Sequence, residues 1–244
     1  VDRHDAADWN RLKEIFASNT LQMVSFTITE KGYSITSPDG AFRADVKADF
    51  EAGPENADSY IGKLAALCYW RYTQGAAPLA LVSMDNCSHN GDKLFAAVDA
   101  YAKAWTENGK AEKGFLEDIE NPAKVSFPWS MIDKITPRPD ASVKKMLEDA
   151  GFTDTESIVT SKNTYVAPFV NAEEAQYLVI ENAFPNGRPA LENAGVMFTS
   201  RETVEKVERM KVCTCLNPLH TALAVYGCLL GYTKISDEMK DADL

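Results

Sequence analysis

The sequence predicts an α/β fold with a doubly wound parallel sheet, and three observations carry this prediction. Residues 21–33 contain a β-branched apolar run that ends in a charged turn with Gly32. Residues 78–84 form a second apolar run, and a polar turn and then a helical pattern follow it. With 244 residues, 45% of them hydrophobic, the chain can bury a sizeable core. Because open α/β sheets bind ligands at the carboxyl ends of their strands, we expect a site after these two runs.

The spacing of apolar residues predicts the remaining elements. Residues 219–230 are almost entirely apolar and are expected to form a buried helix, whereas residues 34–56 are acidic and rich in turn residues and are expected to be a surface loop. Residues 108–121 are a charged segment that contains glycine and lysine, and no element is assigned to them. The other expected helices are residues 8–17, 57–74, 93–105, 141–150 and 202–210, and the other extended segments are residues 125–137 and 176–180.

Composition narrows the function. The net charge of −11 argues against a general nucleic-acid binder, since such binding depends on Lys and Arg neutralising phosphates. Cys213 and Cys215 form a Cys-x-Cys pair, but no second Cys/His pair with zinc spacing accompanies them, and we expect no metal. With neither a signal peptide nor a run of about 20 apolar residues, we expect a cytoplasmic protein without a membrane partner.

The densest group of reactive side chains lies between two apolar segments, in Lys211-Val-Cys-Thr-Cys-Leu-Asn217-Pro-Leu-His220. A proline suits the first turn of a helix, and the residue before it is pushed out of the α region. We therefore expect a helix break here, with Asn217 as an N-cap and His220 as the third helical residue. Taken alone, Lys211 is as readily a solvated lysine, Asn217 only a helix cap and His220 a side chain that meets solvent. Glu208 lies one turn before Lys211. We expect it to be a charge on the helix surface, and the alternative is that its carboxylate tunes the acidity of Lys211.

Two further segments carry candidate polar groups. Asp85-Asn86-Cys-Ser-His-Asn90-Gly91 follows the second strand, where Asn, Asp and Gly are also ordinary turn residues. Asp133 lies in an apolar extended segment, where an unpaired charge would be costly, so we expect it to bond to a substrate or to a backbone cap.

Four stretches resemble the polyol-specific long-chain dehydrogenase family, that of mannitol dehydrogenase. Ser-Phe-Thr-Ile-Thr-Glu-Lys-Gly-Tyr33 resembles the family's Ser-Leu-Thr-(Val/Ile)-Thr-Glu-x-Gly-Tyr, and the turn after residue 84 resembles Ser-Cys-Asp-Asn-x-x-x-Asn-Gly. The segment ending at Pro137 resembles Phe-Pro-x-(Ser/Thr)-Met-Val-Asp-Arg-Ile-Thr-Pro, with Lys134 in place of Arg. The stretch from Lys211 to His220 resembles Lys-x4-Asn-x2-His, with two differences. Five residues, not four, separate Lys211 from Asn217, and Pro218 stands where the family commonly has Gly.

The resemblance implies a metal-independent oxidoreductase that transfers hydride between NAD or NADP and a small sugar-acid or polyol substrate. It implies that Lys211 is the acid/base, and that Asn90 and Asn217 donate N–H groups to the substrate oxygen. His220 and Asp133 would bind substrate. It also implies that Thr29, Glu30 and Asn86 lie beside the cofactor. The Cys-Thr-Cys-Leu-Asn-Pro-Leu-His version is more similar to fructuronate reductases, so D-fructuronate/D-mannonate is the expected substrate pair.

The resemblance also sets the expected organisation. Residues 1–200 would form a Rossmann-like cofactor domain without its first βαβ unit, since the chain contains no Gly-x-Gly-x-x-Gly loop, and residues 201–244 would begin a mainly helical domain. The chain is therefore expected to be an internal portion of a longer enzyme. The alternatives are mannitol 2-dehydrogenase, tagaturonate reductase or, in another class, a non-catalytic Rossmann-like binding module.

Overall fold

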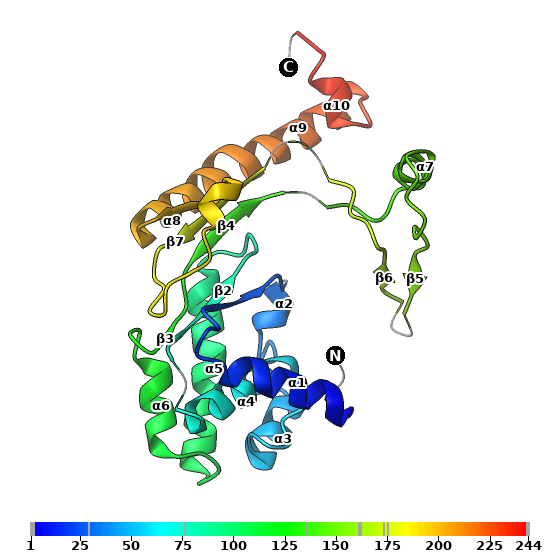
Figure 1. Cartoon of the computed structure of the whole chain (residues 1–244). Helices are drawn as coiled ribbons and strands as arrows, with labels where there is room; N and C mark the ends of the chain where they lie inside the picture. The colour runs from blue at the N-terminus through cyan, green and yellow to red at the C-terminus, as the bar shows by residue number, and fades with distance from the viewer. Residues whose placement is uncertain are drawn as a thin grey trace. The chain divides into compact units, whose positions relative to one another are not determined.

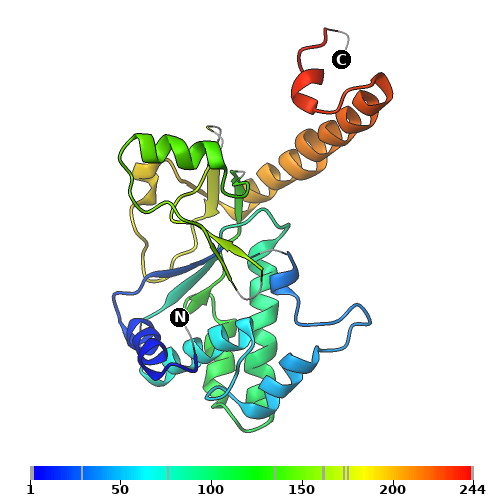
Figure 2. The ribbon, with the colours of Figure 1, turned by 90° about the vertical axis from the view of Figure 1, so that its right-hand side faces the viewer.

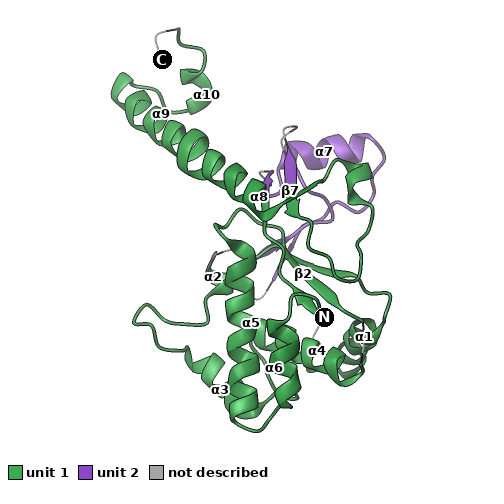
Figure 3. Cartoon of the chain, turned by 90° about the vertical axis from the view of Figure 1, so that its left-hand side faces the viewer, with its two compact units in different colours: residues 1–131, 179–244 green, residues 132–178 purple. Residues whose placement is uncertain are grey.

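The computed structural model describes residues 3–28, 30–75, 77–134, 136–160, 163–172, 174 and 176–242 (Figures 1 and 2). By their internal contacts the residues fall into two compact units (Figure 3). The first unit comprises Val1–Met131 and Val179–Leu244, and the second comprises Ile132–Leu178.

The helices within the described residues are α1 (Ala6–Ala17), α2 (Glu30–Tyr33), α3 (Ala44–Ala52), α4 (Tyr60–Thr73), α5 (Asn90–Glu107), α6 (Lys113–Glu120), α7 (Ala141–Asp149), η1 (Leu191–Ala194), α8 (Arg201–Glu208), η2 (Arg209–Cys215), α9 (Leu216–Leu230) and α10 (Ile235–Glu238). The strands are β1 (Met23–Phe26), β2 (Leu79–Ser83), β3 (Val125–Ser126), β4 (Ser130–Asp133), β5 (Ile158–Val159), β6 (Tyr165–Val166), β7 (Tyr177–Glu181) and β8 (Met197–Thr199).

The first unit confirms the predicted parallel sheet. Strands β1, β2 and β3 run in that order, all parallel, with Val24 opposite Leu81 and Leu79 opposite Val125. Every residue of β2 is buried, as expected for the central strand of a sheet covered on both faces. The carboxyl ends of β1 and β2 therefore lie side by side, and the turn after β2 leads directly into α5.

Helices surround this sheet in the first unit: α1 packs on α4, α4 on α5, and α5 on both α6 and β2 (Figure 1). Trp105, Tyr101, Phe115, Leu81 and Leu94 are fully buried among them. The predicted helices at residues 8–17, 57–74 and 93–105 are confirmed as α1, α4 and α5. The helices predicted from the spacing of apolar residues therefore do form the core.

Two helices lie where the sequence predicted none: residues 34–56 were expected to be a surface loop, and residues 108–121 were assigned no element. Helix α3 falls within residues 34–56 and buries Val46 and Phe50. Helix α6 falls within residues 108–121 and buries Phe115 and Ile119. Each helix presents a single buried apolar pair at i, i+4 in an otherwise charged segment, which is enough to dock it on the core. The loop prediction for residues 34–56 was therefore wrong, and α6 was not predicted.

The second unit is small. It contains α7, which confirms the helix predicted at residues 141–150, and the antiparallel pair β5–β6, with Val159 opposite Tyr165. Asp140 caps α7 by accepting the N–H of Ser142 at 2.7 Å. A further three-stranded sheet has the order β4-β7-β8, and the boundary between the units runs through β4 and β7.

Residues 201–230 form one continuous helix (Figure 1), in which Arg209–Cys215 has π geometry. The helix predicted at residues 202–210 is confirmed, but the break predicted before Pro218 is absent. Within α9 only Gly227 is buried, so the prediction of a buried helix from composition was wrong. By length and composition this helix could cross a membrane, with a mean hydropathy of 1.3 over 18 residues, but the same pattern is found in helices that other protein covers. Whether a second domain begins at residue 201 stays a prediction.

Candidate active site at the carboxyl end of the parallel sheet

The turn after β2 is organised around a buried carboxylate. Asp85 accepts the N–H of Cys87 at 3.0 Å through Oδ1 and the hydroxyl of Tyr33 through Oδ2. Tyr33 ends the short helix α2, which follows β1, so this bond joins the carboxyl ends of the two neighbouring strands. Burial, followed by the hydrogen bond to Asp85, raises the pKa of Tyr33 and keeps it a neutral donor.

Asn90, the first residue of α5, is fully buried in this turn. Its Nδ2 donates to the carbonyl oxygens of Ser130 at 3.1 Å and Asp85 at 3.2 Å, and its Oδ1 accepts the N–H of Ser130 at 3.1 Å. Ser130 Oγ in turn donates to the carbonyl of Ser83. Because both N–H groups have acceptors within the protein, a direct bond from Asn90 to a substrate would require it to leave these partners. The carboxamide is placed to hold the turn against β4.

Position 91 requires glycine, because the chain before β4 passes too close to it for a side chain. A Cβ at this position would lie 2.4 Å from the carbonyl oxygen of Phe127 and 2.7 Å from Cδ1 of Trp129. The preceding residue, His89, adopts a left-handed conformation with φ 49°, and its ring stacks on Trp129 at 4.3 Å between centroids. The Asn-Gly pair of the sequence motif therefore serves tight packing of the β2–α5 turn on the segment before β4.

Helix α8 is fastened to this turn at its last residue. Glu208 is only 5% exposed, and its carboxylate accepts the hydroxyl of Ser88 and, at 3.0 Å, the backbone N–H of His89. Nε2 of His89 lies 3.9 Å from the same carboxylate. The interpretation of Glu208 as a helix-surface charge was wrong, because the residue faces the turn and not solvent.

The first residue of α8 is fastened as well. Nε of Arg201 donates to Glu181 at 3.0 Å, and its guanidinium lies 5.0 Å from the centre of the Trp129 ring. Trp129 also donates its backbone N–H to Glu181 at 3.1 Å and its Nε1 to Asp92 at 2.8 Å. These residues were not among the predicted site residues, although Trp129 and Ser130 belong to the proline-containing stretch that ends at Pro137 and Tyr33 ends the stretch after β1.

Lys211 lies one turn beyond Glu208 and is buried, with 9% of its surface exposed. It lies in the π-segment, where the N–H of Leu216 donates to its carbonyl oxygen five residues earlier. The helix continues through Pro218 without a break. A proline has no N–H to donate and clashes with a carbonyl in a regular α-helix, and the wider π-turn just before Pro218 relieves that conflict. The prediction of Asn217 as an N-cap was therefore wrong, since Cys215 holds the position before α9.

Asn217 and His220 are the second and fifth residues of α9, so the prediction of His220 as the third helical residue was wrong, and both side chains are exposed. At a separation of three residues their side chains are neighbours on the helix surface. Asn217 lines a shallow hollow of about 590 Å³ together with Val212 and Tyr226. The structure thus brings Asn217 and His220 together in a position open to a small molecule, on the helix that also holds the buried Lys211.

The remaining predicted residues are placed as follows. Asn86 is exposed in the turn after β2. Asp133 is half-buried in β4, in the second unit, where burial and then its charge raise the pKa of Tyr177. Thr29 and the side chain of Glu30 lie outside the described residues.

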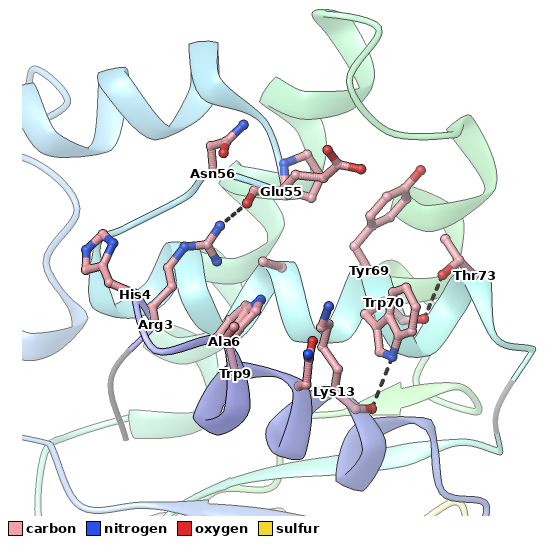
Figure 4. Close-up of a pocket in the computed structure, with 13 residues that line it drawn as sticks. Arg3, His4, Ala6, Trp9, Lys13, Glu55, Asn56, Tyr69, Trp70 and Thr73 are labelled. Atoms are coloured by element: carbon pink, nitrogen blue, oxygen red, sulfur yellow. Dashed lines mark hydrogen bonds between the residues drawn. The ribbon is translucent and has the colours of Figure 1, made fainter.

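A separate groove of about 680 Å³ lies between α1 and α4 (Figure 4). Trp9, Tyr69 and Trp70 line it, and Nε1 of Trp70 donates to the carbonyl of Lys13 at 3.1 Å. None of the predicted site residues lines this groove. Across the part of the chain that the structure describes, no group of three or more His, Cys, Asp or Glu residues is arranged to hold a metal ion.

Comparison with known proteins identifies the fold and the family. Residues 8–193 match the family described as the mannitol dehydrogenase Rossmann domain. The chain is 55% identical to D-mannonate oxidoreductase of Thermotoga maritima and 35% identical to polyol:NADP oxidoreductase of Gluconobacter oxydans, over 96% and 92% of this chain. It spans 43% and 42% of those proteins' lengths.

Two solved structures are similar over most of the chain. A substrate-free D-sorbitol dehydrogenase superposes with a TM-score of 0.78 at 31% identity, covering 97% of this chain and 45% of that one. Mannitol 2-dehydrogenase of Pseudomonas fluorescens, in a ternary complex with NAD and D-mannitol, gives 0.69 at 32% identity, covering 94% and 42%. The predicted Rossmann-like fold is confirmed, and the chain belongs to the mannitol dehydrogenase family.

Proposed function

We propose that the protein of which this chain forms part transfers hydride reversibly between a nicotinamide dinucleotide and a keto sugar acid, with D-fructuronate/D-mannonate as the substrate pair. The observation that carries the proposal is the buried Lys211 on a helix whose Glu208 is bonded to the turn at the carboxyl end of β2. Relatedness at 55% identity to a D-mannonate oxidoreductase supports the choice of substrate.

The residues at this edge fit a nicotinamide dinucleotide. Ligands of doubly wound sheets bind outside the carboxyl ends of the strands, and Asn86 presents an exposed carboxamide there that can both donate and accept hydrogen bonds. Thr29 and Glu30 follow β1 at the same edge and are proposed as its further contacts. When bound, the dinucleotide supplies or accepts the hydride, and the 2′-phosphate preference stays open between NAD and NADP.

Lys211 is proposed as the general acid and base. In the reducing direction its ammonium gives a proton to the carbonyl oxygen while the carbonyl carbon receives hydride, and in the oxidising direction its amine takes the hydroxyl proton. Asn217 donates an N–H to the oxygen on which negative charge develops, a contribution of a few kcal/mol in comparable sites. His220 orients substrate hydroxyls, and Asn90 positions the turn. Asp133 stays a predicted substrate ligand. No step requires a metal ion.

Polyols are the second candidate substrates, since relatives at 30–35% identity include polyol:NADP oxidoreductase and mannitol 2-dehydrogenases. Oxidation of NADH and NADPH by the full-length protein with fructuronate, tagaturonate and fructose separates the candidates. A non-catalytic module would bind no dinucleotide in calorimetry. Retained activity after dialysis against a chelator is expected.

The role of Lys211 is tested by Lys211→Ala in the full-length protein, with Lys206→Ala as the matched control on the exposed face of α8. We expect the first variant to lose more than about tenfold in turnover, which corresponds to ~1.4 kcal/mol of barrier, and the control to retain the parent rate. Equal activity of the two variants would remove Lys211 from the chemistry.

A further inference from the structure

The helix that carries Lys211 changes its hydrogen-bonding register between Lys211 and Asn217. Arg209–Cys215 is a π-segment between two α-helical halves, α8 and α9. Its register is visible in the bond from the N–H of Leu216 to the carbonyl oxygen of Lys211, and the hydroxyl of Thr214 donates at 3.1 Å to the carbonyl of Arg209, again five residues earlier. Such a turn accommodates one more residue than an α-helical turn does.

The half of the helix before the π-segment is held in a fixed rotation. Arg201 bonds to Glu181 and lies over Trp129, and Glu208 bonds to Ser88 and His89. These two anchors are seven residues apart, about 10 Å along the axis, so α8 cannot rotate without breaking one of them. The direction of Lys211, three residues beyond the second anchor, is therefore set by the body of the first unit.

The π-segment then decides where Asn217 and His220 point relative to Lys211. In an uninterrupted α-helix the nine steps from Lys211 to His220 rotate by about 900°, which places the two side chains on opposite faces, about 180° apart. If one residue is absorbed by the π-turn, eight effective steps remain, and the angle falls to about 80°. For Asn217 the same change turns six steps into five, so its angle from Lys211 goes from about 120° on one side of the axis to about 140° on the other, where it lies about 60° beyond His220.

We propose that the π-segment at residues 209–215 positions Lys211 relative to Asn217 and His220 by absorbing one residue, so that the five intervening residues act geometrically as four. This inference rests on the proposed function, since it concerns the same three side chains. It makes the π-turn the part of the fold that brings the exposed imidazole of His220 to within about 80° of Lys211 around the helix axis, with Asn217 about 60° further round. Thr214 is a positioning residue, because its hydroxyl satisfies a carbonyl in the widened turn.

The test shortens and lengthens the segment in the full-length enzyme. Deletion of Cys213, an exposed residue, should convert the π-turn into an α-turn while both flanking halves keep their places. Because Pro218 would then disfavour the straight helix, the deletion is made together with Pro218→Ala, and Pro218→Ala alone is the control. We expect both variants to keep turnover within about fivefold of the parent. Removal of both Cys213 and Thr214 in the same background should cost about 100-fold, as a misplaced acid/base does.

A complementary variant inserts one alanine between Cys213 and Thr214, and we expect it also to lose about 100-fold in turnover while far-UV circular dichroism and the melting temperature stay near those of the parent. The inference is overturned if the single deletion is as inactive as the double deletion while remaining folded, or if the insertion is fully active. These outcomes are separate from failure of the proposed function, in which Lys211→Ala itself would leave the rate unchanged.

Discussion

Glu208 and His89 are joined by a 3.0 Å hydrogen bond from the backbone N–H of His89 to the carboxylate, although 119 residues separate them in the chain. The same carboxylate accepts the hydroxyl of Ser88. These bonds tie the turn after β2 to the helix that bears Lys211. They also explain why an ionisable residue is tolerated at 5% exposure, since a buried carboxylate needs hydrogen-bond donors to offset its desolvation.

Replacement of Glu208 by Gln removes the charge from both bonds and is expected to lower the free energy of unfolding by about 1–3 kcal/mol. Glu202→Gln is the matched control, because Glu202 lies on the exposed face of the same helix and pairs with Lys206 at 2.7 Å, and its effect should stay within about 0.5 kcal/mol. Urea unfolding measures both. If the two variants were equally stable, the bonds of Glu208 to Ser88 and His89 would contribute nothing to stability.

Asn90→Ala is expected to destabilise the protein by about 2–4 kcal/mol, because it removes a fully buried amide and leaves the N–H of Ser130 and two carbonyl oxygens without their partner. Asn86→Ala, in the same turn but exposed, should change stability by less than about 0.5 kcal/mol. Thermal unfolding of the two variants beside the parent distinguishes a positioning residue from a surface one. A shift in melting temperature for Asn86→Ala as large as that for Asn90→Ala would contradict this assignment.

The sequence predicted the strands and their carboxyl-end turns well, because a buried parallel strand is a short apolar run bounded by turn residues, as in residues 78–84. It could not predict helices α3 and α6, where one apolar pair, such as Val46 and Phe50, is all that the core requires. Those pairs become visible only when the partners on α5 are known. Local pattern alone carries no information about such distant partners.

The candidate site was predictable in its residue types but not in its geometry. Pro218 was expected to break the helix, since a proline in an α-helix removes a hydrogen bond and clashes with the carbonyl four residues earlier. The π-segment relieves that conflict, but no rule applied to a single sequence predicts a π-segment. Glu208 and Asn90 illustrate the same limit: the positions were in view, but whether each faces solvent, substrate or protein depends on contacts made across 40 to 120 residues.

The acidity of Asp118 gives a pH-dependent prediction. Burial raises the pKa of Asp118 above its ordinary value of 3.8, against the weaker opposing charges of Lys124 and Arg71. The folded protein therefore holds this proton more tightly than the unfolded chain does, and stability is lost as the pH rises from 3.8 through the raised value. Asp118→Asn removes that loss. Urea midpoints should show the variant more stable than the parent at pH 7, with the difference shrinking as the pH falls toward 4.

The exposed neighbour Glu117 provides the control, and Glu117→Gln should show no such pH-dependent gain. A constant difference between Asp118→Asn and the parent from pH 7 down to pH 4 would mean that an interaction other than the carboxyl ionisation is responsible.

Arg71 joins three separate stretches of the first unit through backbone carbonyls. Its side chain is 4% exposed, and it donates to Ser18 at 2.9 Å, to Ala77 at 2.8 Å and to Leu21 at 3.3 Å. These carbonyls belong to the end of α1, the approach to β1 and the approach to β2, so one guanidinium holds the amino ends of both strands. A planar group with five N–H donors on three nitrogens can reach carbonyls in three directions at once, whereas an ammonium carries its three N–H donors on a single nitrogen.

Arg71→Lys is therefore expected to lower the free energy of unfolding by about 2–4 kcal/mol, because buried carbonyls lose their donors while the charge is kept. Arg11→Lys is the control, since Arg11 pairs with Glu14 at the surface of α1 and should change stability by less than about 0.5 kcal/mol. Urea unfolding measures both variants. If the slope of the unfolding free energy against urea concentration is unchanged, the loss of stability comes from the native state. If Arg71→Lys were as stable as the parent, the carbonyl contacts would be replaceable by a point charge, and the stability of this edge of the sheet would have to come from the packing of α1 on α4.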